Sequence, residues 1–174
     1  MLTNSLTPGA KSPQTGPQPL GGQSAETPAS LDGFLCFGVY STGLAFNRVY
    51  KPLLDRLGLT YPQYIAIVAL LEKDDQMVSE LGEKLFLESN TLTPLIKRLE
   101  SAGLVTRRRD SADERVVRVS LTDKGRAAAQ ESNCISADIL KATGLTLPEL
   151  QELQKKLVRL RDTMTAASGK TRAA

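Results

Sequence analysis

The chain has 174 residues, of which 41% are hydrophobic and 24% are charged, and this composition is typical of one globular domain. It contains no histidine, which excludes a Ser–His or Cys–His catalytic pair and a zinc site of the usual Cys/His kind. Two cysteines are too few for a disulfide scaffold. The net charge is only +3, so a nucleic-acid site has to come from the distribution of charge and not from its total.

The ends of the chain differ from its middle. Residues 1–30 contain five prolines and few aliphatic residues, which predicts a disordered extension, and residues 166–174 are predicted to be a frayed tail. No stretch approaches the ~20 apolar residues that cross a bilayer, and no secretory signal is apparent. We therefore expect a cytoplasmic protein with reduced thiols, without a cofactor or a bound metal.

The middle of the chain begins with helical patterns. Apolar residues recur at helical spacing from Leu35 to Val49 and predict a long first helix, which Pro52 kinks or ends by starting a second one. Thr60 and Pro62 mark the start of the next helix, with Thr60 as its cap. Four aliphatic residues are predicted to form the buried face of that helix: Ile65, Val68, Ala69 and Leu71.

Two shorter helices are predicted next. The first carries Val78, Leu81 and Leu85 on one side. The second begins near residues 89–91, because Pro94 is tolerated only in a first turn, and it stops at Gly103. Its apolar residues are spaced i, i+3, i+4, i+7, as on the buried face of a helix: Leu92, Leu95, Ile96 and Leu99.

The pattern alternates after Gly103. Residues 105–109 and 116–121 are rich in valine and predict a two-stranded hairpin, after which Thr122 and Asp123 open another helix. Thr146 and Glu149 match a capping box that starts the last helix. That helix carries an apolar heptad stripe, which suits an intramolecular core or a dimer contact equally well: Leu150, Leu153, Leu157, Leu160 and Met164.

A short helix, a turn, a second helix and a basic hairpin form the layout of a winged helix-turn-helix. The predicted fold class is therefore mainly α with a small β-hairpin wing. The second helix has small polar side chains near its start, which suit a major groove, and one of these is also expected to cap the helix. The candidate DNA-binding residues of this helix are Ser89, Asn90, Thr91, Thr93, Lys97 and Arg98.

The predicted hairpin is basic, with five arginines against three acids, and arginine suits the negative potential of a minor groove. The arginines of an isolated strand are more often simply solvated, but the position of this hairpin after a helix-turn-helix pattern favours contact with DNA. The five residues are Arg107, Arg108, Arg109, Arg115 and Arg118.

Four segments together resemble the MarR family of bacterial transcriptional regulators: LGEKL at 81–85, SNTLTPLIKRLE at 89–100, GLV at 103–105 and DSADER at 110–115. The resemblance covers about residues 33–165 and implies a MarR-like dimer with a domain at 31–165. Residues 60–122 would bind DNA, and residues 31–58 and 123–165 would dimerise. In that family a wing aspartate orients a wing arginine for the minor groove, and the matching residues are Asp113 and Arg115. Arg107 and Arg109 complete the candidate wing contacts.

A narrower resemblance is to the branch that senses organic hydroperoxides, the OhrR group. It rests on LCFGVYS at 35–41, YKPLL at 50–54 and LTYPQY at 59–64. In that group a cysteine near the start of the first helix is oxidised and two tyrosines hydrogen-bond its sulfur, which implies Cys36, Tyr50 and Tyr61. Two-cysteine members have a resolving thiol in the region of Cys134, which implies a disulfide between subunits. Glu88 and Asn90 stand where the group typically has an aspartate and a glycine.

The residues alone give weaker support for a reactive thiol. A thiol in the first turns of a helix is favoured as thiolate by the helix dipole, and a peroxide converts thiolate to sulfenic acid. However, a cysteine beside Leu35 and Phe37 is more often an inert core residue. Tyr40 and Tyr64 are expected only to pack.

The combined prediction is a homodimeric repressor that binds double-stranded operator DNA when reduced. Oxidation of Cys36 by an organic hydroperoxide would release it, with a disulfide to the partner subunit's Cys134. One alternative is a MarR-type repressor gated by a non-covalent phenolic or drug-like ligand. The other is a thiol peroxidase, which is disfavoured because the chain has no Cys-x-x-Cys motif and no histidine. We expect no enzymatic activity.

Overall fold

The computed structural model describes residues 30–131 and 133–169, without the side chains of residues 133–136. Most of the expected disordered extension and residues 170–174 of the expected tail therefore lie outside the described residues. The chain divides into two compact units, Met1–Gly38 and Val39–Ala174. The described part of the first unit holds a short 3-10 helix, Leu31–Gly33, and the first residues of a long helix.

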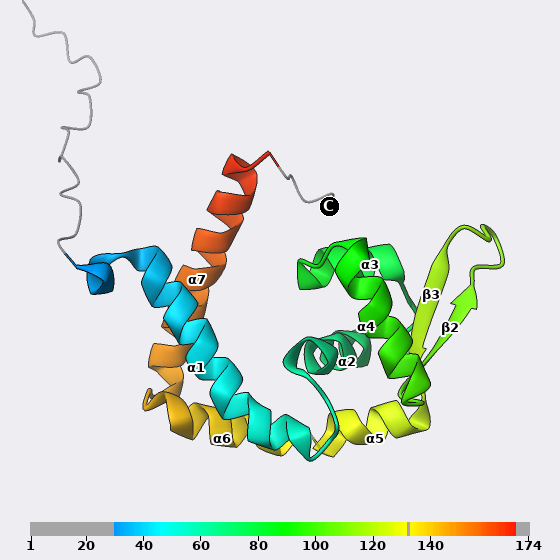
Figure 1. Ribbon diagram of the computed structural model, residues 1–174, viewed down its shortest axis with the longest axis horizontal. Coiled ribbons are helices and arrows are strands. Elements are labelled where there is room, and N and C mark those ends of the chain that lie inside the picture. The colour runs from blue at the N-terminus through cyan, green and yellow to red at the C-terminus, as the bar shows by residue number, and fades with distance from the viewer. Residues whose placement is uncertain (1–29, 132, 170–174) are drawn as a thin grey trace, which may run out of the picture. The chain divides into compact units, whose positions relative to one another are not determined.

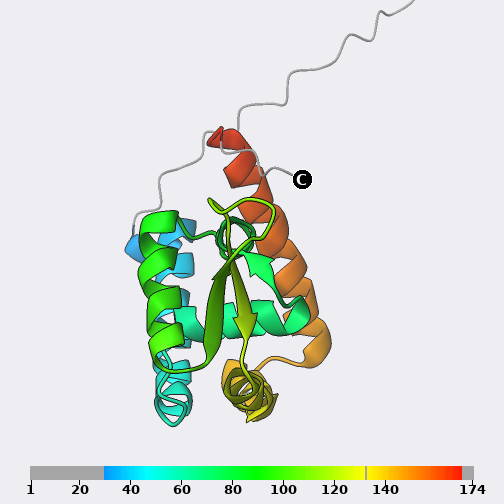
Figure 2. The same ribbon diagram turned by 90° about the vertical axis from the view of Figure 1, so that its right-hand side faces the viewer.

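The described residues form seven α-helices and three short strands, in the order α1 (Leu35–Asp55), α2 (Tyr61–Glu72), β1 (Gln76–Met77), α3 (Val78–Leu85), α4 (Ser89–Ser101), β2 (Val105–Arg109), β3 (Val117–Leu121), α5 (Asp123–Glu131), α6 (Asn133–Thr143) and α7 (Leu147–Ala167). The strands form one antiparallel sheet in the order β1-β3-β2. Within the second unit, Figures 1 and 2 show α3 and α4 beside the β2–β3 hairpin and α5 at its base. The predicted fold class is confirmed.

Helix ends agree largely with the sequence patterns. The helix α2 begins after Thr60, whose backbone N–H and hydroxyl both donate to the Gln63 side-chain oxygen, at 2.8 and 3.0 Å. The same arrangement joins Thr146 to Glu149 at the start of α7. The helix α1 continues through Pro52 to Asp55, so no second helix starts at the proline. One missing N–H near the end of a long helix is not enough to restart it.

The core confirms one predicted helix face and corrects another. All four apolar residues predicted for α4 are buried, from Leu92 to Leu99. In α2 the predicted Ala69 is buried, but the other buried residues are Ala66, Ile67 and Leu70, whereas Leu71 is 44% exposed. The rest of the predicted face is wrong because α2 is apolar on almost every side, so periodicity cannot select a face and packing decides it.

The hairpin is confirmed, and a third strand joins it. The strands β2 and β3 pair from Val105 opposite Leu121 to Arg109 opposite Val117. The two-residue strand β1, too short to show any alternation, adds to the other edge of β3. The helix α5 crosses the base of the hairpin at Gly125, where an added Cβ would lie 2.0 Å from the Leu104 carbonyl oxygen. Only glycine allows this close approach.

The last helix extends further than expected. It reaches Ala167, so two residues of the predicted frayed tail are helical. Its apolar stripe is not an intramolecular core, because no residue of α7 is buried, and Leu153, Leu157 and Met164 are 43%, 42% and 64% exposed. None of the described helices is long and apolar enough to pass through a membrane.

Candidate nucleic-acid interface and thiol site

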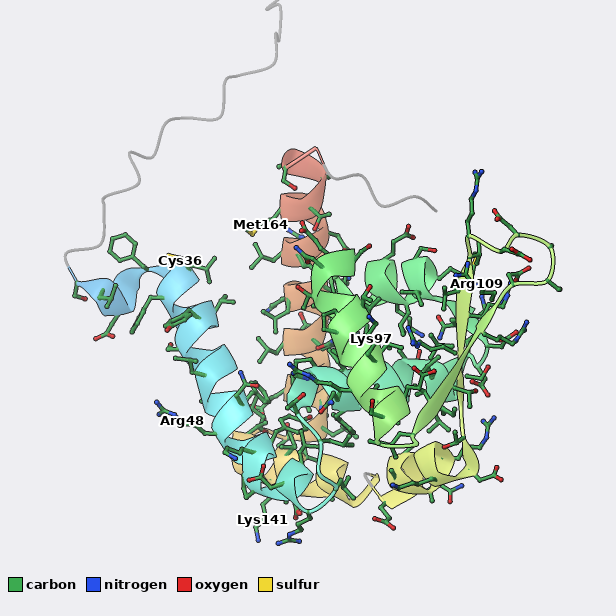
Figure 3. All side chains as sticks on the ribbon, turned by 45° about the vertical axis from the view of Figure 1, so that its right-hand side comes forward. Cys36, Arg48, Lys97, Arg109, Lys141 and Met164 are labelled. Carbon is green, nitrogen blue, oxygen red and sulfur yellow. The ribbon has the colours of Figure 1, made fainter. Side chains whose placement is uncertain are left out.

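The helix α4 buries one face and presents a polar one. The turn before it is tight, because Phe86 ends α3 in the left-handed conformation and the N–H of Leu87 bonds to the Gly82 carbonyl at 2.9 Å. The expected cap among the polar residues is wrong: the N-cap is Glu88, whose side chain makes no capping hydrogen bond. All six candidate residues are exposed: Ser89, Asn90, Thr91, Thr93, Lys97 and Arg98. Figure 3 labels Lys97 on this helix.

The hairpin loop is ordered by its own polar groups. A carboxylate oxygen of Asp113 accepts a hydrogen bond from the backbone N–H of Arg115 at 2.9 Å. The side chain of Arg109, at the end of β2, donates to the Glu114 carbonyl at 2.7 Å and so bridges the two ends of the loop. The side chain of Arg115 is exposed and forms no ion pair within the described part of the chain. Asp113 thus fixes the backbone from which Arg115 extends.

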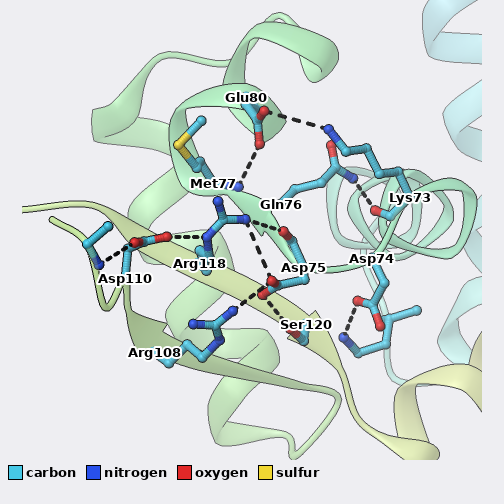
Figure 4. A network of polar contacts seen from close by, with 12 residues as sticks. Lys73, Asp74, Asp75, Gln76, Met77, Glu80, Arg108, Asp110, Arg118 and Ser120 are labelled. Carbon is cyan, nitrogen blue, oxygen red and sulfur yellow. Dashed lines mark hydrogen bonds and ion pairs between the residues drawn. The ribbon is translucent and has the colours of Figure 1, made fainter. Parts of the chain in front are cut away.

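The other three hairpin arginines pair with carboxylates, of which Glu100 and Asp75 lie outside the hairpin and Asp110 lies in its loop. Arg107 binds Glu100 of α4, with Nη2 2.7 Å from the carboxylate. Arg108 donates to Asp75 at 2.7 Å, and Arg118 pairs with Asp110 and with Asp75 (Figure 4). The hydrogen bond from Arg118 holds the pKa of Asp110 below its usual value. Of the five hairpin arginines, Arg109 and Arg115, both at the loop, are the two that form no ion pair with another described residue.

The structure brings helix and hairpin candidates to a common surface. A hollow of about 280 Å³ lies between α3, α4 and the hairpin, and Thr93, Arg107 and Arg115 are among the residues that line it. A second hollow, of about 320 Å³, lies between the starts of α2 and α4 and is lined by Asn90, Thr91 and Arg98. Helix N-termini and exposed cations both favour phosphate, so these residues form a surface suited to a DNA backbone.

The two cysteines fall in helices. Cys36 is the second residue of α1, and its thiol is free and exposed (Figure 3). Cys36 is therefore not a core residue of the single chain, and its reactivity stays a prediction. Cys134 belongs to α6, the second helix after the hairpin, and its side chain lies outside the described residues.

Tyr50 of α1 packs against Tyr61 and Tyr64 of α2. The ring centroid of Tyr50 lies 4.9 Å from that of Tyr61 and 5.9 Å from that of Tyr64. Burial, reinforced by the two neighbouring phenols, raises the pKa of Tyr50 to about 12, and burial also raises the pKa of Tyr61. Both phenols therefore remain neutral hydrogen-bond donors at physiological pH. Tyr64 packs as expected, whereas Tyr40 is 63% exposed.

An apolar groove runs between α1, α6 and α7. It has a volume of about 230 Å³, and its walls are almost entirely aliphatic or aromatic. The lining residues are Thr42, Ala45, Phe46, Val49, Ile139, Ala142, Thr143, Leu145, Leu150 and Leu153. Beyond the groove, Leu157 and Met164 of α7 are also exposed, so the described chain leaves further apolar surface open.

Known proteins resemble this chain over most of its length. Residues 48–132 match the family described as transcriptional regulator SarA/Rot. The HTH-type transcriptional regulator TtmR of Methylorubrum extorquens is 46% identical over 84% of this chain and 75% of its own length. The organic hydroperoxide resistance transcriptional regulator of Bacillus subtilis is 40% identical over 77% of this chain and 91% of its own. The chain belongs to the MarR-like, SarA/Rot-type family of transcriptional regulators.

Solved structures agree with this assignment. Reduced AbfR of Staphylococcus epidermidis, bound to DNA, matches this MarR-like regulator with a TM-score of 0.65 and 32% identity, over 76% of this chain and 91% of AbfR. AbfR with a disulfide formed matches with a TM-score of 0.53 and 34% identity, over 72% and 88%. The regulator is thus a DNA-binding winged-helix protein of the OhrR-like kind, with α3 and α4 as its helix-turn-helix and β2–β3 as its wing.

Two features of this MarR-like regulator escaped sequence reasoning. Asp75 takes a positive φ of 52° and contacts both strands of the wing, but nothing in its local pattern distinguishes it from a solvated loop residue. Arg161 of α7 lies over the ring of Phe86, 4.7 Å from its centroid, and so connects the last helix to the turn before α4. Pairs this distant in sequence leave no periodic signal.

Proposed function

We propose that this MarR-like regulator is a homodimeric, redox-sensing repressor that binds operator DNA in its reduced state. An organic hydroperoxide oxidises Cys36 and thereby releases the DNA. The observation that carries the proposal is the free, exposed thiol in the first turn of α1. The resemblance to a regulator of organic hydroperoxide resistance supports this inducer, and the repressor acts in the cytoplasm, where its operator lies. In this proposal the protein is a sensor and not an enzyme, because each Cys36 reacts with one peroxide and then stays oxidised.

The chemistry consumes one peroxide per Cys36 thiol. The Cys36 sulfur reacts as its thiolate, the nucleophilic form of a thiol. This thiolate attacks one peroxide oxygen, the O–O bond breaks, an alcohol leaves after protonation and the sulfur becomes sulfenic acid. The thiol of the partner subunit's Cys134 then attacks this sulfur, so that an S–S bond forms and water leaves. The existence of AbfR in a disulfide-formed state supports this second step.

The proposed hydrogen bonds from Tyr50 and Tyr61 to the sulfur act between subunits. Cys36 and Tyr50 both belong to α1, fourteen positions apart (50 minus 36). A helix of fourteen residues is about 21 Å long, far more than a hydrogen bond to sulfur. We therefore assign to the Cys36 thiolate the partner subunit's Tyr50 and the partner subunit's Tyr61. Their raised pKa values keep these phenols protonated, as donors must be.

The apolar groove and the α7 stripe supply the surface for dimerisation. Covering the groove between α1, α6 and α7 with a second copy removes exposed aliphatic surface from water, which contributes roughly 25 cal/mol per Å². In the dimer the two α4 helices enter successive major grooves of a pseudo-palindromic operator, and Arg115 of each wing reaches the flanking minor groove. A disulfide at the dimer surface changes the distance between the two α4 helices, and affinity falls.

The decisive experiment compares wild type with Cys36→Ser. The operator is first recovered by in vitro selection from random-sequence duplexes, and binding is followed by fluorescence anisotropy before and after cumene hydroperoxide. Both proteins are expected to bind, and only wild type to dissociate. If Cys36→Ser also leaves the DNA on oxidation, Cys36 is not the sensor.

Cys134→Ser tests the second step. The variant is expected to form sulfenic acid, detected with dimedone, but no covalent dimer on a non-reducing gel, and to recover DNA binding on reduction. A covalent dimer in this variant would contradict the assignment of Cys134. Counting peroxide consumed per subunit separates a sensor, which reacts once, from a thiol peroxidase, which turns over.

The groove also favours a second candidate function, a repressor gated by a phenolic or drug-like ligand. Its volume of about 230 Å³ and apolar walls suit a small aromatic molecule. Thiol alkylation distinguishes the two functions: blocking Cys36 abolishes the response to hydroperoxide, whereas a response to salicylate as a test phenol would survive it.

A further inference from the structure

Asp75 occupies a conformation that favours glycine. It lies between α2 and β1 with a φ of 52°, in the left-handed region. Aspartate tolerates this region better than most residues, but still at a cost relative to glycine. We therefore look for the role of Asp75 in its side-chain contacts. Figure 4 shows Asp75 facing the wing.

The contacts of Asp75 reach both strands of the wing. Its carboxylate accepts hydrogen bonds from Arg108 Nη2 of β2 at 2.7 Å and from Ser120 Oγ of β3 at 3.1 Å. Its backbone carbonyl accepts from Arg118 Nη1 of β3 at 2.8 Å, and the same nitrogen lies 3.6 Å from the carboxylate. One residue of the helix-turn-helix body therefore contacts three side chains of the hairpin.

These contacts offset the repulsion between two arginines in the sheet. Arg108 and Arg118 are directly opposite each other in the β2–β3 register. Like charges in opposite cross-strand positions repel and destabilise an antiparallel pair. The carboxylate of Asp75 pairs with both guanidinium groups and so offsets that repulsion.

The same network extends to the wing loop. Arg118 also donates to Asp110, the residue that follows β2. Asp110 in turn accepts from the backbone N–H of Ala112 at 2.8 Å, and its own N–H donates to the Val116 carbonyl at 2.9 Å. The loop that carries Arg115 is thus connected to Asp75 through a single arginine side chain.

We propose that Asp75 is a positioning residue for DNA binding: it fixes the wing against the helix-turn-helix so that Arg115 reaches the minor groove beside the site of α4. This inference rests on the proposed contact between the wing and DNA. The proposed role needs no contact between Asp75 and DNA, because its carboxylate is engaged by Arg108 and Ser120 and would repel phosphate.

The test uses the sign of the charge effect. Asp75→Asn removes a negative charge, which by itself strengthens DNA binding. We expect the opposite, a loss of about tenfold in affinity for the selected operator at fixed salt. The matched control is Asp55→Asn, which removes the same charge from an exposed i,i+4 pair on α1 and is expected to bind as tightly as wild type or slightly more tightly.

Arg115→Ala provides the second arm of a double-mutant cycle. If Asp75 acts through Arg115, Asp75→Asn costs little in the Arg115→Ala background, and both single variants lower the salt dependence of binding by a similar amount. A full additional loss in the double variant would overturn the proposal, and so would an unchanged affinity of Asp75→Asn. Asp75→Gly, which relaxes the backbone at this φ, replaces the asparagine variant if that protein melts early.

The proposed contact between the wing and DNA and the positioning role of Asp75 are tested separately. If Arg115→Ala binds DNA like wild type, the wing contact itself is absent and both inferences fall. If Arg115→Ala binds weakly but Asp75→Asn and Asp75→Gly bind normally, the wing contact stands and only the positioning role of Asp75 is wrong.

Discussion

Arg107 of the wing and Glu100 of α4 form a two-point contact, in which Nε and Nη2 of the arginine lie 2.8 and 2.7 Å from the same carboxylate oxygen. This pair joins the first strand of the hairpin to the end of the helix proposed to read DNA. Because the guanidinium is already engaged, Arg107 differs from Arg115, although both were predicted to contact DNA.

Arg107→Ala and Arg115→Ala are therefore expected to act on different quantities. Arg107→Ala lowers the free energy of unfolding by about 1 kcal/mol, because the pair is only partly exposed and charge-assisted. Arg115→Ala leaves the free energy of unfolding unchanged and lowers both operator affinity and the salt dependence of binding, by about one phosphate equivalent. Urea denaturation and anisotropy titrations at several salt concentrations measure the two effects. Equal loss of stability in both variants would contradict this division.

The half-buried phenol of Tyr50 makes the free energy of unfolding depend on pH in the alkaline range. Its pKa is about 12 in the folded protein and 10.0 in the unfolded chain, because burial disfavours the phenolate. Between pH 10 and 12 the Tyr50 phenol is deprotonated in the unfolded chain but still protonated in the folded protein. The free energy of unfolding is therefore unaffected by this group below pH 10 and falls as the pH rises toward 12. Urea denaturation across this interval should show a smaller fall for Tyr50→Phe than for wild type. Tyr40→Phe, at an exposed ring, is the control and should reproduce the wild-type curve.

Sequence reasoning succeeded where one local period decides the structure. The spacing of Leu92 to Leu99 on α4 selects a single face, and that face is the buried one. It failed on α2, where apolar residues surround the helix and only tertiary packing separates buried Leu70 from exposed Leu71. Local periodicity carries no information about such a choice.

The candidate site divides in the same way. The helix-turn-helix, the wing and the position of Cys36 in a first helical turn all follow from local pattern and resemblance. The division of the wing arginines does not, because Arg108 and Arg118 are engaged by Asp75, more than thirty residues away. Sequence composition counts charges, whereas only the fold pairs them.

The unpredicted strand β1 depends on Gln76, a buried polar residue that is 3% exposed. Its amide nitrogen donates to the carbonyls of Ala69 and Lys73 at 2.8 and 2.5 Å, and so satisfies the end of α2. Gln76→Leu keeps the volume but leaves the Lys73 carbonyl without its donor and the Ala69 carbonyl with only the Lys73 N–H, at 3.3 Å. We expect a cost of about 1–3 kcal/mol in the free energy of unfolding. Chemical denaturation measures this loss. Gln63→Leu removes the two capping hydrogen bonds at the start of the same helix and is the comparison. It is expected to lose less, because those bonds are exposed and water replaces them. An equal loss would show that burial of the Gln76 amide adds nothing.

The exposed stripe of α7 gives the sharpest test of dimerisation. Leu157 is 42% exposed in the single chain, so a charge there costs little in the folded monomer but is buried unpaired if a second copy covers the stripe. Leu157→Glu is therefore expected to retain its circular dichroism spectrum, to sediment as a monomer and to lose at least tenfold in operator affinity, because each half-site is then bound separately. Gln154→Glu adds the same charge to the same helix at an exposed position outside the stripe and should remain dimeric. A monomeric wild type, or a Leu157→Glu protein that still sediments as a dimer, would show that this face does not join two subunits.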